Sequence, residues 1–147
     1  MPYGLGAKTA YKHIDCSGFC VATQIQENGG PLISDGHIID LDCTSAHHLV
    51  TDSKPGVHTT IQINDADAQR GDMIGLDRSL PEWNHIANVA YVVYDPINFR
   101  FDDLIIYEAL GDAPGVPGPQ NLIRHYDGID AYIDNGYQHK SVRWDYQ

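Results

Sequence analysis

The fold is most strongly constrained by two long apolar segments in the second half of the chain. One runs from His85 through Tyr94 and the other from Leu104 to Leu110, and both are rich in residues that favour β-strands. Asp95-Pro96-Ile97-Asn98 follows the first segment and places aspartate first and proline second, as a β-turn prefers. We therefore predict an antiparallel hairpin in which His85 lies directly opposite Glu108.

The first half of the chain has helical character. A helix is predicted from residue 15 or 16 to about Gln26, because Asn28-Gly29-Gly30-Pro31 would end it. A second, short helix is predicted over 44–50. Helices that precede strands indicate an α+β domain, and 147 residues fit a single domain over 1–147. Further strands are predicted at 57–63, 73–76 and 140–146, and a loop at 111–119.

The net charge excludes some classes of partner. Twenty acidic and nine basic residues give a formal net charge of −11, which repels nucleic acid and anionic membrane surfaces. The N-terminus lacks the basic start and apolar stretch of a signal peptide, and no run of about 20 apolar residues occurs. We expect synthesis in the cytoplasm without a signal peptide, no membrane insertion and no nucleic-acid partner.

One of the three cysteines has the surroundings of a nucleophile. Cys16 stands at the predicted start of the first helix, where unpaired N–H groups favour a thiolate and can stabilise an oxyanion. A free cysteine is more often a small buried hydrophobe, which is our interpretation of Cys20. The polar neighbours Asp15 and Ser17 favour the nucleophile for Cys16. Cys20 and Cys43 could form a disulfide, and no metal or cofactor site is expected.

His85 is the predicted general base, because it opens the longest strand at the rim of the sheet. Glu108, placed opposite by the hairpin, would orient the imidazole; its alternative is an exposed strand carboxylate. The pair Asp102-Asp103 is unusual inside a strand and indicates a bulge that could shift this register. The adjacent His47 and His48 are interpreted as a solvated helix face. The remaining polar-flanked histidines are interpreted as surface residues, namely His37, His58, His125 and His139.

These residues resemble a known family. Asp15-Cys16-Ser17-Gly18-Phe19 is similar to the Asp-Cys-Ser-Gly signature of the NlpC-type cell-wall peptidases, which are papain-like cysteine hydrolases. Further similarities follow in the family's order: Tyr3-Gly4-Leu5-Gly6 resembles its lead-in, Thr44-Ser45 the opening of its second helix, Gly71-Asp72-Met73 the strand before the histidine, His85-Ile86-Ala87 the histidine strand, Ile106-Tyr107-Glu108-Ala109 the strand of the third polar residue, and Val142-Arg143 the last strand.

The resemblance implies a fold and an activity. The fold would be papain-like, with the N-terminal helix that carries Cys16 packed on an antiparallel sheet that carries His85. The activity would be hydrolysis of an amide bond in peptidoglycan stem peptides, between D-γ-glutamate and the diamino acid, through a thioester acyl-enzyme. Tyr3, Asp15 and Ser17 would bind the substrate. The chain departs from the family where Glu108 replaces a common histidine and Cys43 replaces a common arginine, which leaves the substrate preference open.

Two other functions stay open. One is an N-acetylmuramoyl-L-alanine amidase of the related CHAP type, and the other is a catalytically inactive wall-binding module on the same fold. Without a signal peptide, an enzyme of this kind would reach the cell wall or periplasm after lysis or by specialised delivery. A phage lysis protein, an injected antibacterial effector and the catalytic piece of a larger protein all fit. Peptidoglycan is the expected partner, together with an immunity or delivery protein.

Overall fold

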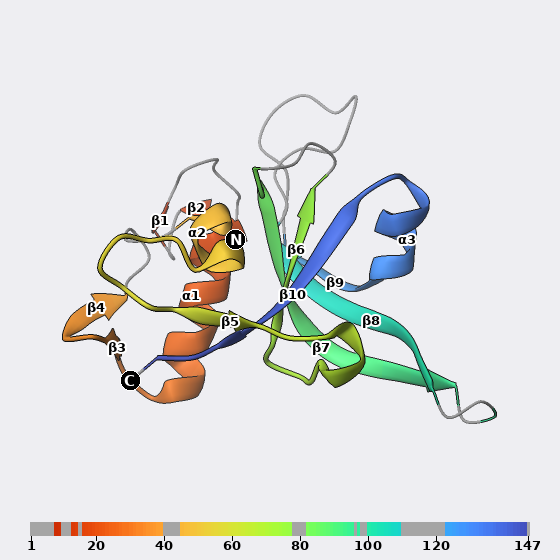
Figure 1. Cartoon of the computed structure of the whole chain (residues 1–147), viewed down its shortest axis with the longest axis horizontal. Helices are drawn as coiled ribbons and strands as arrows, with labels where there is room; N and C mark the ends of the chain where they lie inside the picture. Colours follow the sequence, from red (N-terminus) through yellow and green to blue (C-terminus); the bar gives the residue numbers. More distant parts are fainter. Residues whose placement is uncertain are drawn as a thin grey trace.

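A six-stranded antiparallel sheet with helices on both faces organises the fold (Figure 1). The computed structural model describes residues 8–9, 13–14, 16–39, 45–77, 82–95, 97, 100–109 and 123–146. The strands of the sheet are β5 (Thr60–Gln62), β6 (Met73–Asp77), β7 (His85–Asp95), β8 (Arg100–Ala109), β9 (Ile123–Gly128) and β10 (Gln138–Trp144). Their order across the sheet is β5-β10-β6-β7-β8-β9.

Short elements surround this sheet. The helices are α1 (Cys16–Asn28), α2 (Ala46–Thr51), α3 (Ile129–Asp134) and the 3-10 turn η1 (Asp65–Asp67). Two small ladders complete the described part, β1 (Lys8–Thr9) with β2 (His13–Ile14), and β3 (Leu32–Ser34) with β4 (His37–Ile39). The chain is thus α+β, with an N-terminal helix and an antiparallel sheet among the described residues, as predicted.

Both predicted helices are confirmed close to their expected bounds. Helix α1 begins at Cys16 and ends at Asn28, where Gly29 takes a φ of +75° that suits glycine. Helix α2 is capped at its start by Ser45, whose Oγ accepts the His48 N–H at 3.2 Å. The predicted loop at 111–119 lies outside the described residues.

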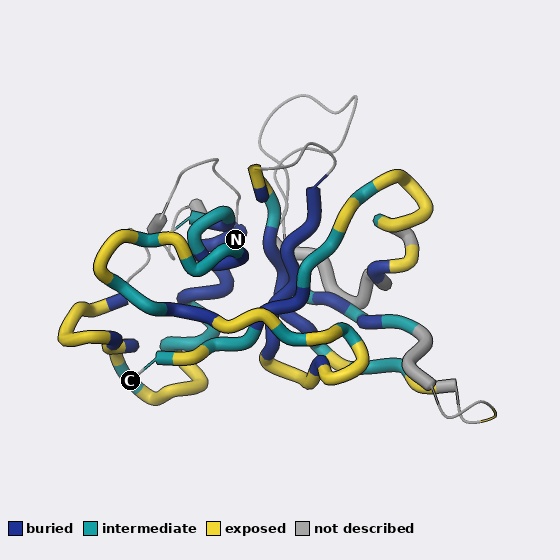
Figure 2. Tube along the Cα trace, viewed as in Figure 1, coloured by how far each residue is buried: buried dark blue, intermediate teal, exposed yellow. Residues whose placement is uncertain are grey.

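The two faces of the sheet carry separate groups of buried side chains, and the central strands are buried along most of their length (Figure 2). Because side chains alternate along a strand, neighbouring residues of β6 and β7 enter different groups. The group on the side of α1 and α2 includes Cys16, Cys20, Val21, Leu49, Val50, Met73, Ile86 and Val142. The group on the side of α3 includes Ile74, Leu76, Ala87, Val89, Leu104, Ile106 and Ile129.

Helix α2 approaches the sheet closely because Gly75 of β6 has no side chain. A Cβ atom at Gly75 would lie 2.5 Å from Cγ2 of Val50 and 3.2 Å from Cε3 of Trp83. Such distances are shorter than van der Waals contact, so any larger residue would force α2 or the Trp83 ring to move. The absence of a side chain at Gly75 therefore sets the distance between α2 and β6, the strand that pairs with the start of β7.

The turn between β7 and β8 is longer than predicted. Asp95 pairs with Arg100 and not with Asn98, so the four residues 96–99 connect the strands where two were predicted. Each strand also contains one β-bulge, with Ala90 and Asp102 as the extra residues. The second bulge confirms the irregularity predicted at Asp102-Asp103. The bulges are defined by the pairs Val89↔Ile106, Tyr91↔Ile105, Val93↔Asp103 and Tyr94↔Phe101.

Candidate functional site

Cys16 is the first residue of α1, where the helix meets the sheet. Helix α1 packs on β7, and Cys16 is 5% exposed within the apolar group on that face. The first turn of α1 contains no acidic side chain, so the N–H groups there keep their partial positive charge. The position is that of a helix-start thiol, as predicted, although most of the residue is covered.

The sulfur of Cys16 contacts the loop that leads into β7. Cys16 Sγ donates a hydrogen bond to the carbonyl oxygen of Asn84 at 3.6 Å. The same loop is held from two other sides. The Asn84 N–H donates to Oδ2 of Asp77 at 2.7 Å, and the Trp83 N–H donates to Nδ1 of His47 at 3.2 Å. Cys16, Asp77 and His47 therefore all bind the backbone of the two residues that precede His85.

The side chain of His85 lies on the other face of the sheet. His85 pairs with Leu76 of β6, and its ring stacks on the ring of Tyr132 in α3, with centroids 6.2 Å apart and an interplanar angle of 27°. Leu76 and Tyr132 both belong to the apolar group on the α3 side. The structure thus brings Cys16 to the backbone beside His85 but turns the imidazole away from the sulfur. The catalytic pairing of the two stays a prediction.

Glu108 does not take the predicted position opposite His85. Tyr107 of β8 pairs with Asn88 of β7, which aligns the strands two residues away from the predicted register. Glu108 follows Tyr107 and is paired on its other side with Arg124 of β9. The prediction of direct opposition is wrong because the turn is longer than a two-residue connection. The side chain of Glu108 lies outside the described residues, so its orienting role stays a prediction.

Only one of the three predicted substrate-binding residues lies in the part of the chain that the structure describes. Tyr3 and Asp15 lie outside the described residues. Ser17, the second residue of α1, is 2% exposed, so only a rearrangement of the helix start would present its hydroxyl to a ligand. Cys20 is fully buried, as expected of a core cysteine, while Cys43 lies outside the described residues and the disulfide stays a prediction.

The two adjacent histidines of α2 were predicted to form a solvated helix face, but both make contacts with the rest of the fold. His47 accepts the backbone N–H of Trp83 and lies 3.6 Å from Oε2 of Glu82. His48 is partly buried, and its Nδ1 has no hydrogen-bond partner among the described residues. Burial, followed by the charges of Lys54 and His47, lowers the pKa of His48. The sequence signal for this helix is Ser45, whose hydroxyl caps α2 and fixes the residue at which the helix begins.

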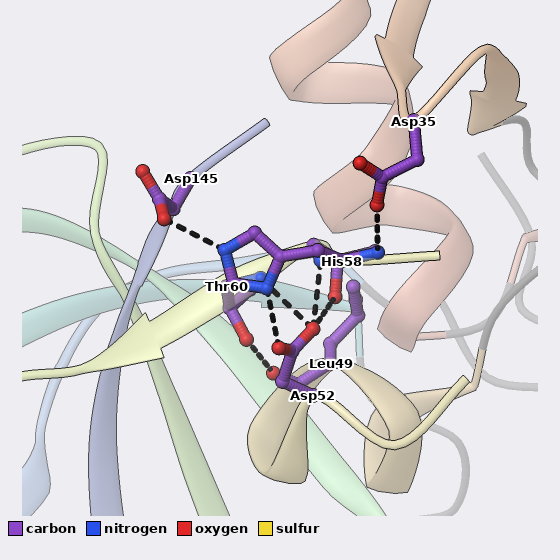
Figure 3. A network of polar contacts seen from close by, with 7 residues as sticks. Asp35, Leu49, Asp52, His58, Thr60 and Asp145 are labelled. Carbon is purple, nitrogen blue, oxygen red and sulfur yellow. Dashed lines mark hydrogen bonds and ion pairs between the residues drawn. The ribbon is translucent and has the colours of Figure 1, made fainter. Parts of the chain in front are cut away.

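A second polar network, missed from the sequence, surrounds His58 (Figure 3). Nδ1 of His58 lies 2.5 Å from Oδ2 of Asp52, and Nε2 lies 2.7 Å from Oδ2 of Asp145. Asp52 ends α2 in a left-handed conformation and accepts the Thr59 N–H at 2.7 Å, while Asp35 accepts the His58 N–H at 3.3 Å. The interpretation of His58 as an isolated surface residue is therefore wrong.

This network is a structural clamp rather than a catalytic triad. Both imidazole nitrogens face carboxylates, so neither is directed at a nucleophile. The carboxylates also lie at opposite ends of the ring and do not converge on one point, as metal ligands must. Within the part of the chain that the structure describes, no group of three or more His, Cys, Asp or Glu side chains could hold a metal ion.

The clamp predicts a pH-dependent contribution to stability. Hydrogen bonds to Asp145 and then Asp52 raise the pKa of His58 above 6.5. A raised histidine pKa stabilises the fold fully below about pH 6.5, and this stabilisation is lost as pH rises through the folded-state pKa. We expect His58→Gln to lower the free energy of unfolding by about 0.5–1 kcal/mol near pH 6, because the ring is half-exposed, and by less near pH 9.

Urea unfolding of the wild type and His58→Gln between pH 5 and pH 9 measures this difference. His37→Gln is the matched control, because His37 is exposed on β4 and bonds neither Asp52 nor Asp145 in the described structure. Asp52 stays ionised throughout this range, because its pKa lies below the ordinary value for an aspartate. Burial opposes ionisation of Asp52, but hydrogen bonds from Thr59 and His58 outweigh it and lower its pKa. A difference that is constant over the whole range would contradict the clamp.

Comparison with known proteins gives no family: no family model, no curated protein and no solved structure matches the chain. Among the described residues, the helices are all too short or too polar to cross a membrane. The feature of the molecule that bears on function is therefore the placement of Cys16 at a helix start, against the loop before β7.

Proposed function

We propose that the chain is a cysteine hydrolase that cleaves an amide bond in peptidoglycan stem peptides, with Cys16 as nucleophile. One observation carries the proposal: the thiol lies at the first residue of a helix packed on an antiparallel sheet, within 3.6 Å of the residue that precedes His85. A helix on such a sheet is the arrangement of papain-like hydrolases, the fold that the sequence resembles.

The proposed reaction passes through a thioester. The Cys16 thiolate attacks the carbonyl carbon, and N–H groups at the start of α1 stabilise the oxyanion. His85 transfers the thiol proton to the leaving amine, so the C–N bond breaks, and then accepts a proton from the water that hydrolyses the thioester. Since His85 stacks on Tyr132, its side chain must turn toward α1 for this chemistry. A change of rotamer alone does not move the ring to the other face of the sheet, so the backbone at the first residues of β7 must also change.

The proposed substrate is the bond between D-γ-glutamate and the diamino acid. Tyr3, Asp15 and Ser17 are proposed to hold the charged groups of the stem peptide, and Glu108 to orient the imidazole. The enzyme would act on the wall after lysis or specialised delivery, as a phage lysis protein or an antibacterial effector with an immunity or delivery partner. Cleavage of the N-acetylmuramoyl-L-alanine bond, as in CHAP amidases, is the alternative within the same chemistry.

A catalytically inactive wall-binding module is the second candidate. The observation that favours it is the placement of the two key groups: the Cys16 thiol bonds a backbone carbonyl, while the His85 ring packs on the opposite face. In such a module Cys16 would only support the loop before β7. A protein of this kind is expected to bind peptidoglycan without cleaving it.

Digestion of purified peptidoglycan tests these candidates in one experiment. The soluble fragments are identified by mass spectrometry, and free amino groups report each cleaved bond. New amines on the diamino acid support the proposed peptidase, whereas new N-terminal L-alanine indicates the amidase. Sedimentation of the protein with intact peptidoglycan and no released fragments would reject catalysis and leave the binding module.

A further inference from the structure

A cavity of about 840 Å³ lies beside the C-terminal half of α1, away from Cys16. Its wall on the helix side is formed by Thr23, Gln24 and Glu27. Thr23 is seven residues beyond Cys16 in the same helix, which corresponds to about 10 Å along the axis. The sheet side is formed where β6 begins, where β10 ends and where β7 bulges at Ala90. The cavity is therefore separate from the proposed catalytic site.

Two of the residues that line this cavity carry buried donors that bond nothing in the described structure. Asn88 is 7% exposed and its Nδ2 has no hydrogen-bond partner among the described residues. Nε1 of Trp144 is likewise buried without a partner in that part of the chain. Buried polar groups without partners are rare because they lose their bonds to water, so two in one cavity point to a ligand. Both groups donate, and the ligand must therefore present acceptors.

The charges around the cavity define the ligand further. Asp72 and Arg143 also line it, but they neutralise each other through bonds of 2.8 and 2.9 Å. Two exposed charges of opposite sign remain on the lining, Arg70 and Glu27. A cation on the same lining as two N–H donors favours a ligand with a carboxylate, and a carboxylate on that lining favours a ligand with an ammonium group. The rings of Tyr107, Tyr91 and Trp144 supply apolar surface between them.

We infer that this cavity binds a small zwitterion of the amino-acid or short-peptide type, with its carboxylate at the Asn88 and Trp144 N–H groups. Arg70 supplies the positive charge at that end, and Glu27 receives the ammonium group. The bulge at Ala90 bends β7 at this point and redirects its side chains, as bulges beside functional sites do. The inference does not depend on the proposed hydrolase, because neither Cys16 nor His85 lines the cavity.

Titration with glycylglycine, followed by ¹⁵N NMR of the indole N–H groups, tests the inference. The chain has two tryptophans, Trp83 and Trp144, so the indole region has its own internal control. The Cys16→Ala variant is used throughout, so that no peptide can be cleaved. We expect glycylglycine to shift the Trp144 signal with millimolar affinity and to leave the Trp83 signal in place. N-acetylglycinamide keeps the amides but lacks both charges, and we expect at least tenfold weaker binding.

Variants separate recognition from folding. Arg70→Gln is expected to weaken glycylglycine binding about tenfold, whereas Lys54→Gln removes the same charge outside the cavity and should have no effect. Asn88→Leu should abolish binding without lowering the melting temperature, because it removes an unpaired buried amide. No shift of Trp144 at 20 mM glycylglycine, or equal binding of N-acetylglycinamide, would overturn the inference. If Asn88→Leu does not fold, the comparison of Arg70→Gln with Lys54→Gln decides.

Discussion

Replacing Cys16 with alanine is expected to lower the rate of peptidoglycan hydrolysis by roughly 10⁴-fold or more, since removing the nucleophile removes the acyl-enzyme route. The fold should persist, because the change removes one sulfur atom from a residue at the helix start. Release of stem-peptide fragments measures the rate, and circular dichroism measures the fold.

The matched control is Cys20→Ala. Cys20 is fully buried in the same apolar group and lies one helical turn further along α1. Its replacement should cost more stability than that of Cys16 and leave the rate per folded molecule within a few-fold of the wild type. Full activity in Cys16→Ala would contradict the proposed mechanism.

The identity of the base is tested with the same assay. His85→Ala should be nearly as inactive as Cys16→Ala if the imidazole turns toward α1. His47→Ala is the informative comparison, because His47 binds the backbone of the loop that Cys16 also contacts. If only His47→Ala loses activity, His47 of α2 is the general base, and the role of His85 is to pack against Tyr132.

Replacing Arg143 with methionine is expected to lower the free energy of unfolding by about 2–4 kcal/mol. Asp72 is 4% exposed, and both of its carboxylate oxygens accept bonds from the Arg143 guanidinium. Without Arg143 the buried carboxylate keeps the Gln69 N–H, at 2.8 Å, as its described partner. The cost is placed below that of a fully buried pair because the Arg143 side chain is 36% exposed.

Urea denaturation measures this loss, and two variants control it. Arg70→Met removes a neighbouring exposed cation and should change stability by less than about 0.5 kcal/mol. The double variant with Asp72→Asn removes the stranded charge and should recover part of the loss. A double variant as unstable as the sum of the two single variants would show that the pair is not coupled.

The local parts of the fold could be predicted from the sequence. Helix α1 followed from its apolar spacing and from the Asn28-Gly29-Gly30-Pro31 stop, and the Asp102 bulge followed from a charged pair inside a strand. The β3–β4 hairpin also has a signal in the sequence. Asp35-Gly36 separates two short apolar segments, and both residues take positive φ angles, as a tight hairpin turn requires.

The parts that depend on register and on distant contacts could not be predicted. The face on which the His85 side chain lies is set by its pairing with Leu76, and a sequence does not state strand alignment. The His58 clamp joins residues up to 87 positions apart, each of which looks like an ordinary polar surface residue. Cys16 could be located at a helix start, but its degree of burial depends on the loop before β7.

The place of β10 in the sheet has a consequence for synthesis. β10 is the last described strand along the chain, yet it lies between β5 and β6 and pairs with both. While a ribosome is still making the chain, the facing edges of β5 and β6 have no partner, and unpaired edges attract other chains. The sheet can be completed only after Trp144 has left the exit tunnel. A nascent chain that stalls before Gln138 therefore exposes two unpaired strand edges, to which chaperones can bind.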